Sequence, residues 1–149
     1  MFLLQHPEAL KAVVAEVDAA RASWMVSHPD TPLTSVNFHE FMQSSSDQFP
    51  VMTSCIQETL RMRSSSFSIR RVGTPIEFAG FHFDVGDSLV CNTRAVHMDE
   101  KIYERPTEFI YDRFTDAGKK RAALNGKTGM LPFLPFGGGV SMCEGRYVA

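Results

Sequence analysis

A glycine-rich stretch near the end of the chain carries the residues best suited to chemistry. Gly137, Gly138 and Gly139 let the backbone turn tightly and approach a flat group closely, because none of them has a β-carbon. Cys143 follows, at the point where a helix is expected to begin. The free N–H groups of a helix start favour a thiolate over a thiol. Such a charge among apolar neighbours is costly unless the sulfur binds a metal.

Other binding modes fit this stretch less well. A phosphate cradle needs Lys-Ser or Lys-Thr after the glycines, but Cys143-Glu144 stands there. Dinucleotide binding needs Gly-x-Gly-x-x-Gly after a strand, and the third glycine is out of register. A zinc site needs more ligands nearby. The remaining alternative is a surface loop with a buried, unreactive cysteine, which is the usual meaning of a lone cysteine.

The spacing Phe136-x-x-Gly139-x-x-x-Cys143-x-Gly145 resembles the haem-binding signature of the cytochromes P-450. In that family the cysteine is the thiolate ligand of haem iron and favours O–O cleavage. The resemblance therefore implies that Cys143 is the axial, catalytic ligand of a haem iron. It also implies a haem-binding loop that includes Phe136, Gly137, Gly139 and Gly145.

Two positions depart from the family's pattern. Ser141 stands where many members carry Arg or His towards a haem propionate, and Glu144 stands where many carry Pro.

Glu58 and Arg61 lie three residues apart, which places them on one face of an expected helix. Taken alone, they form a solvated surface pair worth a few tenths of a kcal/mol. In place and order they resemble the Glu-x-x-Arg motif of the family's K helix. The later segment Pro106-x-x-Phe109-x-x-Asp112-Arg113-Phe114 resembles the element that supplies the motif's partner. The resemblance implies a structural triad of Glu58, Arg61 and Arg113.

Arg70 follows in a segment that resembles the strand from which an arginine reaches a haem propionate. Bidentate pairing of guanidinium and carboxylate suits that role. Spacing to the next strand favours Arg70 over Arg71. The alternative is that both are ordinary charges of an edge strand.

Hydrophobic spacing and turn residues predict the elements that position these side chains. Helices are expected at about 7–26 and 51–63, with shorter ones near 36–42 and 99–103. Short runs at 67–69, 75–78, 81–85 and 88–92 predict one small sheet over 67–92. A meander and the cysteine loop follow over about 105–145, mostly as extended chain. This is a mainly α fold with a small β-sheet (α+β), expected as a single partial cytochrome P-450 domain over 1–149, from the J helix to the start of the L helix.

Composition excludes several classes of protein. The 149-residue chain has a formal net charge of -2 and dispersed basic residues, which argues against a nucleic-acid groove or a polybasic membrane patch. No apolar run is long enough to span a bilayer. Three widely spaced cysteines disfavour a disulfide framework, so either Cys55 and Cys91 are small buried residues beside a special Cys143, or all three are inert.

The resemblance implies a haem-thiolate monooxygenase that inserts one oxygen atom from O2 into a lipophilic substrate. Its cofactor would be haem b, with electrons from NADPH through a reductase partner. Details such as Ser-Ser-Ser-Phe-Ser-Ile-Arg are similar to the branch of sterol and oxysterol 7α-hydroxylases, sterol 12α-hydroxylase and prostacyclin synthase. That branch suggests a sterol-like substrate and the endoplasmic reticulum membrane for a full-length parent, which would be anchored through an N-terminal segment that this chain lacks.

Two alternatives remain. One is a family-type isomerase or dehydratase, similar to prostacyclin synthase. The other is a non-catalytic remnant that binds haem weakly or not at all. Full-length members are several-fold longer and carry an I helix with an acid–alcohol pair that the chain lacks. The 149 residues alone are therefore expected to be inactive.

Overall fold

The computed structural model describes residues 2–32, 37, 39, 41, 48–124, 126, 132–138 and 142–147. The chain forms two compact units, and each is described by itself. The first unit comprises Met1–Thr59 and Glu108–Gly129, and the second comprises Leu60–Thr107 and Met130–Ala149. The sequence predicts a single partial domain over this same span.

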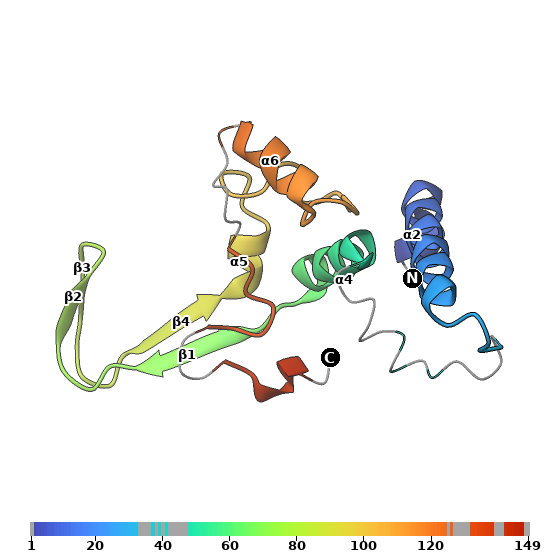
Figure 1. The fold of residues 1–149 in the computed structure, drawn as a ribbon. Coiled ribbons are helices and arrows are strands. Elements are labelled where there is room, and N and C mark those ends of the chain that lie inside the picture. The colour runs from blue at the N-terminus through green and yellow to red at the C-terminus, as the bar shows by residue number, and fades with distance from the viewer. Residues whose placement is uncertain are drawn as a thin grey trace. The chain divides into compact units, whose positions relative to one another are not determined.

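Helix α2 (Pro7–Ser27) is the longest element of the first unit and follows the short helix α1 (Phe2–Gln5) (Figure 1). Pro7 starts it, because proline lacks the N–H that the first turn leaves without a partner anyway. The helix buries Ala9, Val13, Ala20 and Trp24. Hydrophobic spacing in the sequence groups Leu10 and Val14 with Val13 on one apolar stripe, but Leu10 and Val14 stay exposed.

Helix α4 (Pro50–Arg63) starts against α2 through a charged cap. The carboxylate of Glu16 accepts hydrogen bonds from the N–H groups of Val51 (2.7 Å) and Met52 (2.8 Å). A carboxylate at a helix start satisfies backbone donors and complements the helix dipole. A small core of Ala9, Val13 and Cys55 lies between the two helices.

Helix α6 (Asp116–Leu124) lies in the region expected to be extended. Thr115 caps it, since its Oγ1 accepts a hydrogen bond from the N–H of Gly118 at 3.1 Å. Its sequence Asp-Ala-Gly-Lys-Lys-Arg carries no apolar stripe, which is why hydrophobic spacing did not predict it.

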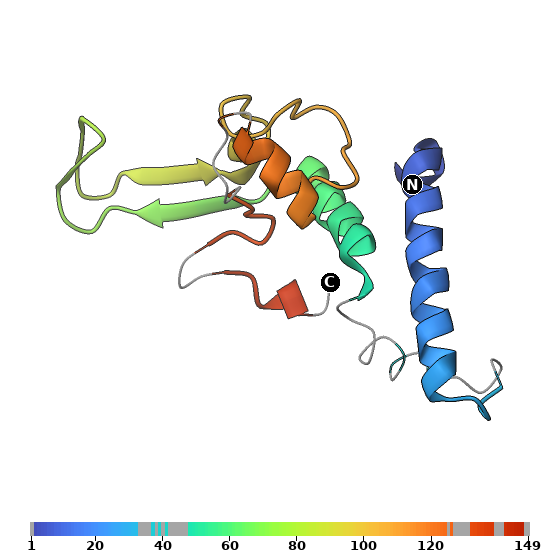
Figure 2. The same cartoon turned by 45° about the horizontal axis from the view of Figure 1, so that its top comes forward.

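The second unit contains two separate two-stranded antiparallel sheets where one sheet was expected (Figures 1 and 2). Strands β1 (Phe67–Arg71) and β4 (Ser88–Asn92) pair with Phe67 opposite Asn92. Strands β2 (Ile76–Phe78) and β3 (Phe81–Phe83) form the hairpin between them. Ala79 and Gly80 both have positive φ, as a tight two-residue hairpin turn requires.

Helix α5 (Thr93–His97) continues directly from β4. The side chain of Asn92 caps it by accepting a hydrogen bond from the N–H of Arg94 at 3.0 Å. The helix predicted near 99–103 is wrong, because those residues form turns after α5 has ended. The helix predicted at 36–42 lies largely outside the described residues.

The predicted fold class, mainly α with a small antiparallel sheet, is confirmed. The two long helices predicted at 7–26 and 51–63 correspond to α2 and α4. In the described part of the chain, no helix has the length and apolar character needed to cross a membrane.

Candidate functional site

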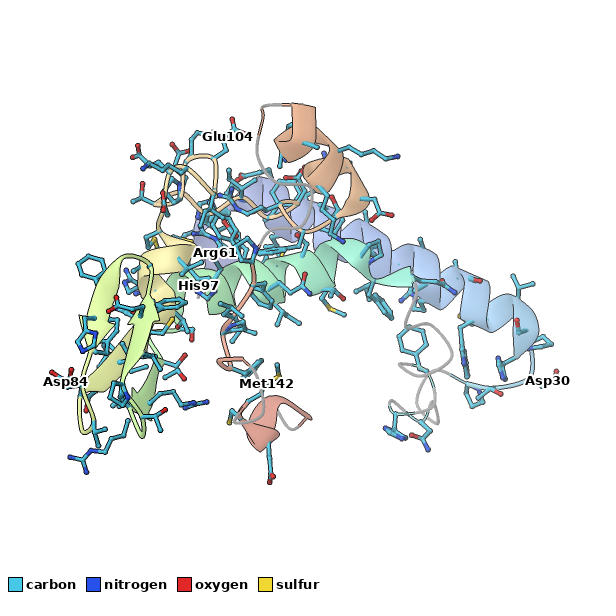
Figure 3. All side chains as sticks on the ribbon, turned by 90° about the vertical axis from the view of Figure 1, so that its left-hand side faces the viewer. Asp30, Arg61, Asp84, His97, Glu104 and Met142 are labelled. Carbon is cyan, nitrogen blue, oxygen red and sulfur yellow. The ribbon has the colours of Figure 1, made fainter. Side chains whose placement is uncertain are left out.

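The cysteine loop belongs to the second unit, and Met142 marks it in Figure 3. Cys143 precedes the 3-10 helix η4 (Glu144–Tyr147), and its side chain is exposed and forms no disulfide. Its N–H donates to the carbonyl of Phe136 at 3.0 Å, which holds the cysteine next to the residue that precedes the three glycines. Gly139 lies outside the described residues.

Two glycines have a defined part in this geometry. Gly137 adopts φ +80°, a conformation that favours glycine, and its N–H donates to the carbonyl of Leu134 at 3.2 Å. A β-carbon at Gly145 would lie 3.4 Å from Sγ of Cys143. Glycine therefore leaves the sulfur uncovered on that side.

Hydroxyl groups hold the backbone that leads into the loop. Ser64, just after α4, donates through Oγ to the carbonyl of Pro135 at 2.7 Å. Ser66 approaches the same carbonyl at 3.5 Å and exchanges hydrogen bonds with Thr93 at the start of α5. The segment between α4 and β1 thus bonds to Pro135, and Thr93 at the start of α5 bonds in turn to Ser66.

His97 was not singled out from the sequence, yet it is fully buried in the second unit. Its Nε2 accepts a hydrogen bond from the N–H of Leu134 at 2.9 Å. Its ring stacks on Phe133, with 6.0 Å between centroids, and meets Tyr103 edge on. Burial lowers the pKa of His97 below its ordinary 6.5, and the Arg61 guanidinium lowers it further. The imidazole is therefore neutral at physiological pH.

Arg61 is also fully buried, on the last turn of α4. Its Nη1 donates to the carbonyl of His97 at 2.7 Å, and its guanidinium lies 5.1 Å from the ring centre of Tyr103. Figure 3 shows Arg61 and His97 as neighbours. Arg61 thereby connects α4 to α5 through a backbone carbonyl.

Glu58 and Arg113 form a buried ion pair in the first unit. Glu58 is 0% exposed and Arg113 is 5% exposed, and Nε of Arg113 lies 3.0 Å from both carboxylate oxygens. Glu58 also accepts from the N–H of Ile110, and Arg113 donates to the carbonyl of Glu108. Both charges have hydrogen-bond partners besides each other, which a buried pair requires.

The three charged residues of the predicted triad make two separate sets of contacts. Glu58 pairs with Arg113, while Arg61 bonds to the carbonyl of His97 and lies over Tyr103. The surface alternative for Glu58 and Arg61 is wrong, because both side chains are fully buried. The triad as a unit stays a prediction.

Arg70 lies exposed on β1, and its Nη1 donates to the carbonyl of the preceding Ile69 at 2.9 Å. Arg71 is also exposed and donates through Nε to Gly86 at 3.4 Å. These contacts leave donors of the Arg70 guanidinium facing solvent. The propionate role of Arg70 stays a prediction.

The other two cysteines differ from each other. Cys55 is buried, and burial together with Glu16, Glu58 and Asp112 raises its pKa to about 11. Cys91 is exposed on β4, so the alternative in which Cys55 and Cys91 are both small buried residues is wrong for Cys91. Cys91 lies on the same face of β4 as Leu89, whose side chain is partly covered, but Cys91 itself stays exposed.

We expect alkylation of the native chain at pH 8 to modify Cys91 and Cys143 but not Cys55. With a pKa of about 11, roughly one Cys55 in a thousand is a thiolate, and burial blocks the reagent as well. Mass spectrometry of peptides after a short iodoacetamide pulse measures the result. Rapid labelling of Cys55 without denaturant would contradict the buried position.

An open pocket of about 700 Å³ lies in the first unit, and none of the predicted cofactor-binding residues lines it. Its walls come from the start of α4, the turn at 111–115 and the start of α6. Among the described residues, no three His, Cys, Asp or Glu side chains gather to hold a metal ion.

Known proteins match this chain over nearly its whole length. The family model described as "Cytochrome P450" matches residues 1–149. The 25-hydroxycholesterol 7-alpha-hydroxylase of Rattus norvegicus is 32% identical, over 99% of this chain and 36% of that protein. Cytochrome P450 7B1 of Mus musculus is 33% identical, over 99% and 29%. The 7-alpha-hydroxycholest-4-en-3-one 12-alpha-hydroxylase of Homo sapiens is 32% identical, over 100% and 30%.

Solved structures share the fold. Cyanobacterial CYP120A1 with bound retinoic acid superimposes with a TM-score of 0.70 at 24% identity, over 99% of this chain and 29% of that one. A zebrafish cytochrome P450 with progesterone gives 0.69 at 24% identity, over 99% and 29%. The chain spans about a third of the length of the curated relatives.

Proposed function

Because this chain belongs to the cytochrome P450 family, we propose that it is the haem-ligating part of a monooxygenase that acts on a sterol-like lipid. The observation that carries the proposal is the exposed sulfur of Cys143 in a glycine loop that leaves it accessible. The family implies a haem cofactor and electrons supplied by a reductase. We further propose haem b, with NADPH as the source of those electrons.

The residues of the loop fit a haem. A thiolate is a soft ligand suited to iron, and a porphyrin supplies the nitrogens that the described residues do not gather. A β-carbon at Gly137 would meet no atom within 4 Å, and Gly145 carries none beside the sulfur. The open space at Gly137 and the missing β-carbon at Gly145 leave room for a flat cofactor on those sides of the loop.

Each predicted residue has a proposed part. Cys143 binds the iron, and its N–H bond to Phe136 fixes the position of its Cα. Phe136 and Gly137 form the turn beside it, with Gly139 and Gly145 completing the loop. Arg70 pairs with a haem propionate through the guanidinium donors that its bond to Ile69 leaves available.

A bound haem would supply the activation of dioxygen, a reaction that takes two electrons and two protons, puts one oxygen atom into the substrate and releases the other as water. The chain's own part is to hold the thiolate. Glu58, Arg61 and Arg113 form the proposed structural triad, which secures α4 and the turns that follow it. Ser64 follows α4 directly and bonds to Pro135, so a well-ordered α4 also helps to hold the backbone that leads into the loop.

The substrate class rests on the relatives. Their names refer to 25-hydroxycholesterol and to 7α-hydroxycholest-4-en-3-one. These names describe hydroxylases, which favours monooxygenation over the isomerase or dehydratase alternative. We propose a sterol-like substrate, and the endoplasmic reticulum membrane for the whole protein.

Turnover requires more than the matched region. The relatives carry about two thirds of their length outside it. We propose that the 149-residue chain ligates haem but does not hydroxylate substrate alone. Hydroxylated sterol formed by the purified chain with a reductase would contradict this.

We expect haem titration of the chain to give a thiolate-type absorption spectrum that Cys143→Ser abolishes. Cys91→Ser is the matched control, because Cys91 is also exposed but lies on β4. Its spectrum should equal that of the unchanged chain. If the unchanged chain gives no thiolate-type spectrum, the remnant alternative holds. If Cys91→Ser removes the spectrum instead, the assigned ligand is wrong.

A further inference from the structure

His97 is joined to the cysteine loop by an unbroken series of contacts within the second unit. Its Nε2 accepts the N–H of Leu134, and the carbonyl of Leu134 accepts the N–H of Gly137. Gly137 follows Phe136, whose carbonyl accepts the N–H of Cys143 at 3.0 Å. The imidazole therefore lies at the start of the backbone path that ends at the candidate ligand.

The same side chain is clamped from its other sides. Arg61 donates to the carbonyl of His97, so α4 fixes the backbone of α5 at this residue. The ring stacks on Phe133, and Tyr103, edge-on to it, donates through its hydroxyl to the carbonyl of Pro132 at 2.7 Å. Segment 132–134 is thus held by its backbone and by its aromatic side chain.

We propose that His97 is a positioning residue of the cysteine loop, whose neutral imidazole fixes the backbone at Leu134 and, through it, the turn that places Cys143. This proposal rests on the proposed function, since the loop that His97 positions carries Cys143, the proposed haem ligand. It concerns a residue outside the predicted loop, triad and propionate contacts.

The hydrogen-bond chemistry assigns the tautomer. Because the N–H of Leu134 is a donor, Nε2 must carry the lone pair and Nδ1 the proton. Nδ1 is buried, and it has no hydrogen-bond partner among the described residues. A buried donor without a hydrogen-bond partner is destabilising, so packing alone does not explain a histidine here. What a histidine supplies at this position is the hydrogen-bond acceptor Nε2 for the N–H of Leu134.

Protonation would reverse this contact. An imidazolium would present N–H to the N–H of Leu134, and the two donors would repel. Among the described residues, the charged groups that act on the ring are Arg61 from α4 and Arg94 on α5, and segment 132–135 contributes none. Both guanidiniums disfavour the imidazolium. The pKa of His97 is lower in the folded chain than its ordinary 6.5, so the contact is complete above about pH 6.5 and is lost as pH falls through the lowered value.

Two substitutions distinguish the effect of the hydrogen-bond acceptor from the effect of losing the imidazole ring. In His97→Gln the side-chain oxygen reaches the place of Nε2 and does not titrate. In His97→Asn the oxygen lies near the place of Nδ1 and falls short of Leu134. We expect the Leu134 amide to exchange its hydrogen at a similar rate in His97→Gln and about tenfold faster in His97→Asn, since a net hydrogen bond of about 1.4 kcal/mol corresponds to tenfold.

The pH profile requires only the unchanged chain and the glutamine variant. The ratio of their Leu134 exchange rates, measured by NMR at each pH, cancels the intrinsic effect of acid on exchange. We expect a ratio near one above pH 6.5, rising as the pH is lowered. A ratio that stays constant with pH, or equal Leu134 rates in all three chains, would overturn the proposal.

Haem loading distinguishes this inference from the proposed function. We expect His97→Asn to give a smaller thiolate-type fraction on haem titration, and His97→Gln to restore it. If Leu134 protection follows His97 while Cys143→Ser leaves the haem spectrum unchanged, His97 positions the loop but Cys143 is not the ligand. If Cys143→Ser abolishes the spectrum but His97→Asn alters neither it nor Leu134, the ligand stands and the positioning role fails.

Discussion

Glu58→Gln is expected to lower the free energy of unfolding by about 3–5 kcal/mol, because it leaves the Arg113 guanidinium buried without its counter-charge. Glu58 has no exposed surface, and both of its oxygens lie 3.0 Å from Nε of Arg113. The amide side chain keeps the shape but removes the charge. Since whole domains are stable by only about 5–15 kcal/mol, much of the chain's stability should be lost. Urea unfolding followed by circular dichroism measures it.

The control is the exposed pair of Arg121 and Asp112, which has a similarly short distance of 2.8 Å. Arg121 is 46% exposed, and exposed pairs contribute about 0–1 kcal/mol because water screens them. Arg121→Gln should therefore change the urea midpoint only slightly. Equal losses in the two variants would mean that the Glu58–Arg113 pair is not buried as described.

Gly118→Ala is expected to destabilise the chain by about 3 kcal/mol, although alanine is usually the better residue in a helix by about 1 kcal/mol. Gly118 lies in the first turn of α6 and is buried against the preceding turn. A β-carbon there would collide with the carbonyl of Asp112 and lie 2.6 Å from the carbonyl oxygen of Arg113. The obstacle is backbone, which cannot rotate away. The turn that presents Arg113 to Glu58 would have to move.

Gly73→Ala is the matched control for this change. A β-carbon at Gly73 meets no atom within 4 Å, so the same added methyl group should alter the urea midpoint little. A stabilising effect of Gly118→Ala, as helix propensity alone predicts, would contradict the close approach of α6 to the turn at 112–113.

The sequence predicts the long helices more readily than which of their faces is buried. Hydrophobic spacing locates α4 and groups Ile56 with Cys55 and Leu60 on one apolar face, but Ile56 is exposed. The buried face instead carries Ser54, Cys55, Glu58 and Arg61. Polar residues are buried there because each finds a partner, such as Arg113 for Glu58 and the carbonyl of His97 for Arg61. Those partners are distant in sequence, so spacing within the helix cannot reveal them.

The candidate site was predicted unevenly for a similar reason. Cys143 and its glycines form a compact motif whose spacing is itself informative. His97 lies 37 residues from its partner Leu134, in a segment with no such motif. The sequence around it offers only a histidine a few residues after an expected strand. That pattern does not distinguish a buried hydrogen-bond acceptor from a surface side chain. The two small sheets differ from the predicted one because alternation identifies strands but not their partners.

X-ray absorption at the iron edge of the haem-loaded chain is the sharpest test of the proposal that Cys143 is the sulfur ligand of a haem iron. We predict one sulfur neighbour per iron in the unchanged chain and in Cys91→Ser, and only lighter neighbours in Cys143→Ser. An iron surrounded by nitrogen and oxygen alone in the unchanged chain, or a sulfur neighbour that survives Cys143→Ser, would contradict the account.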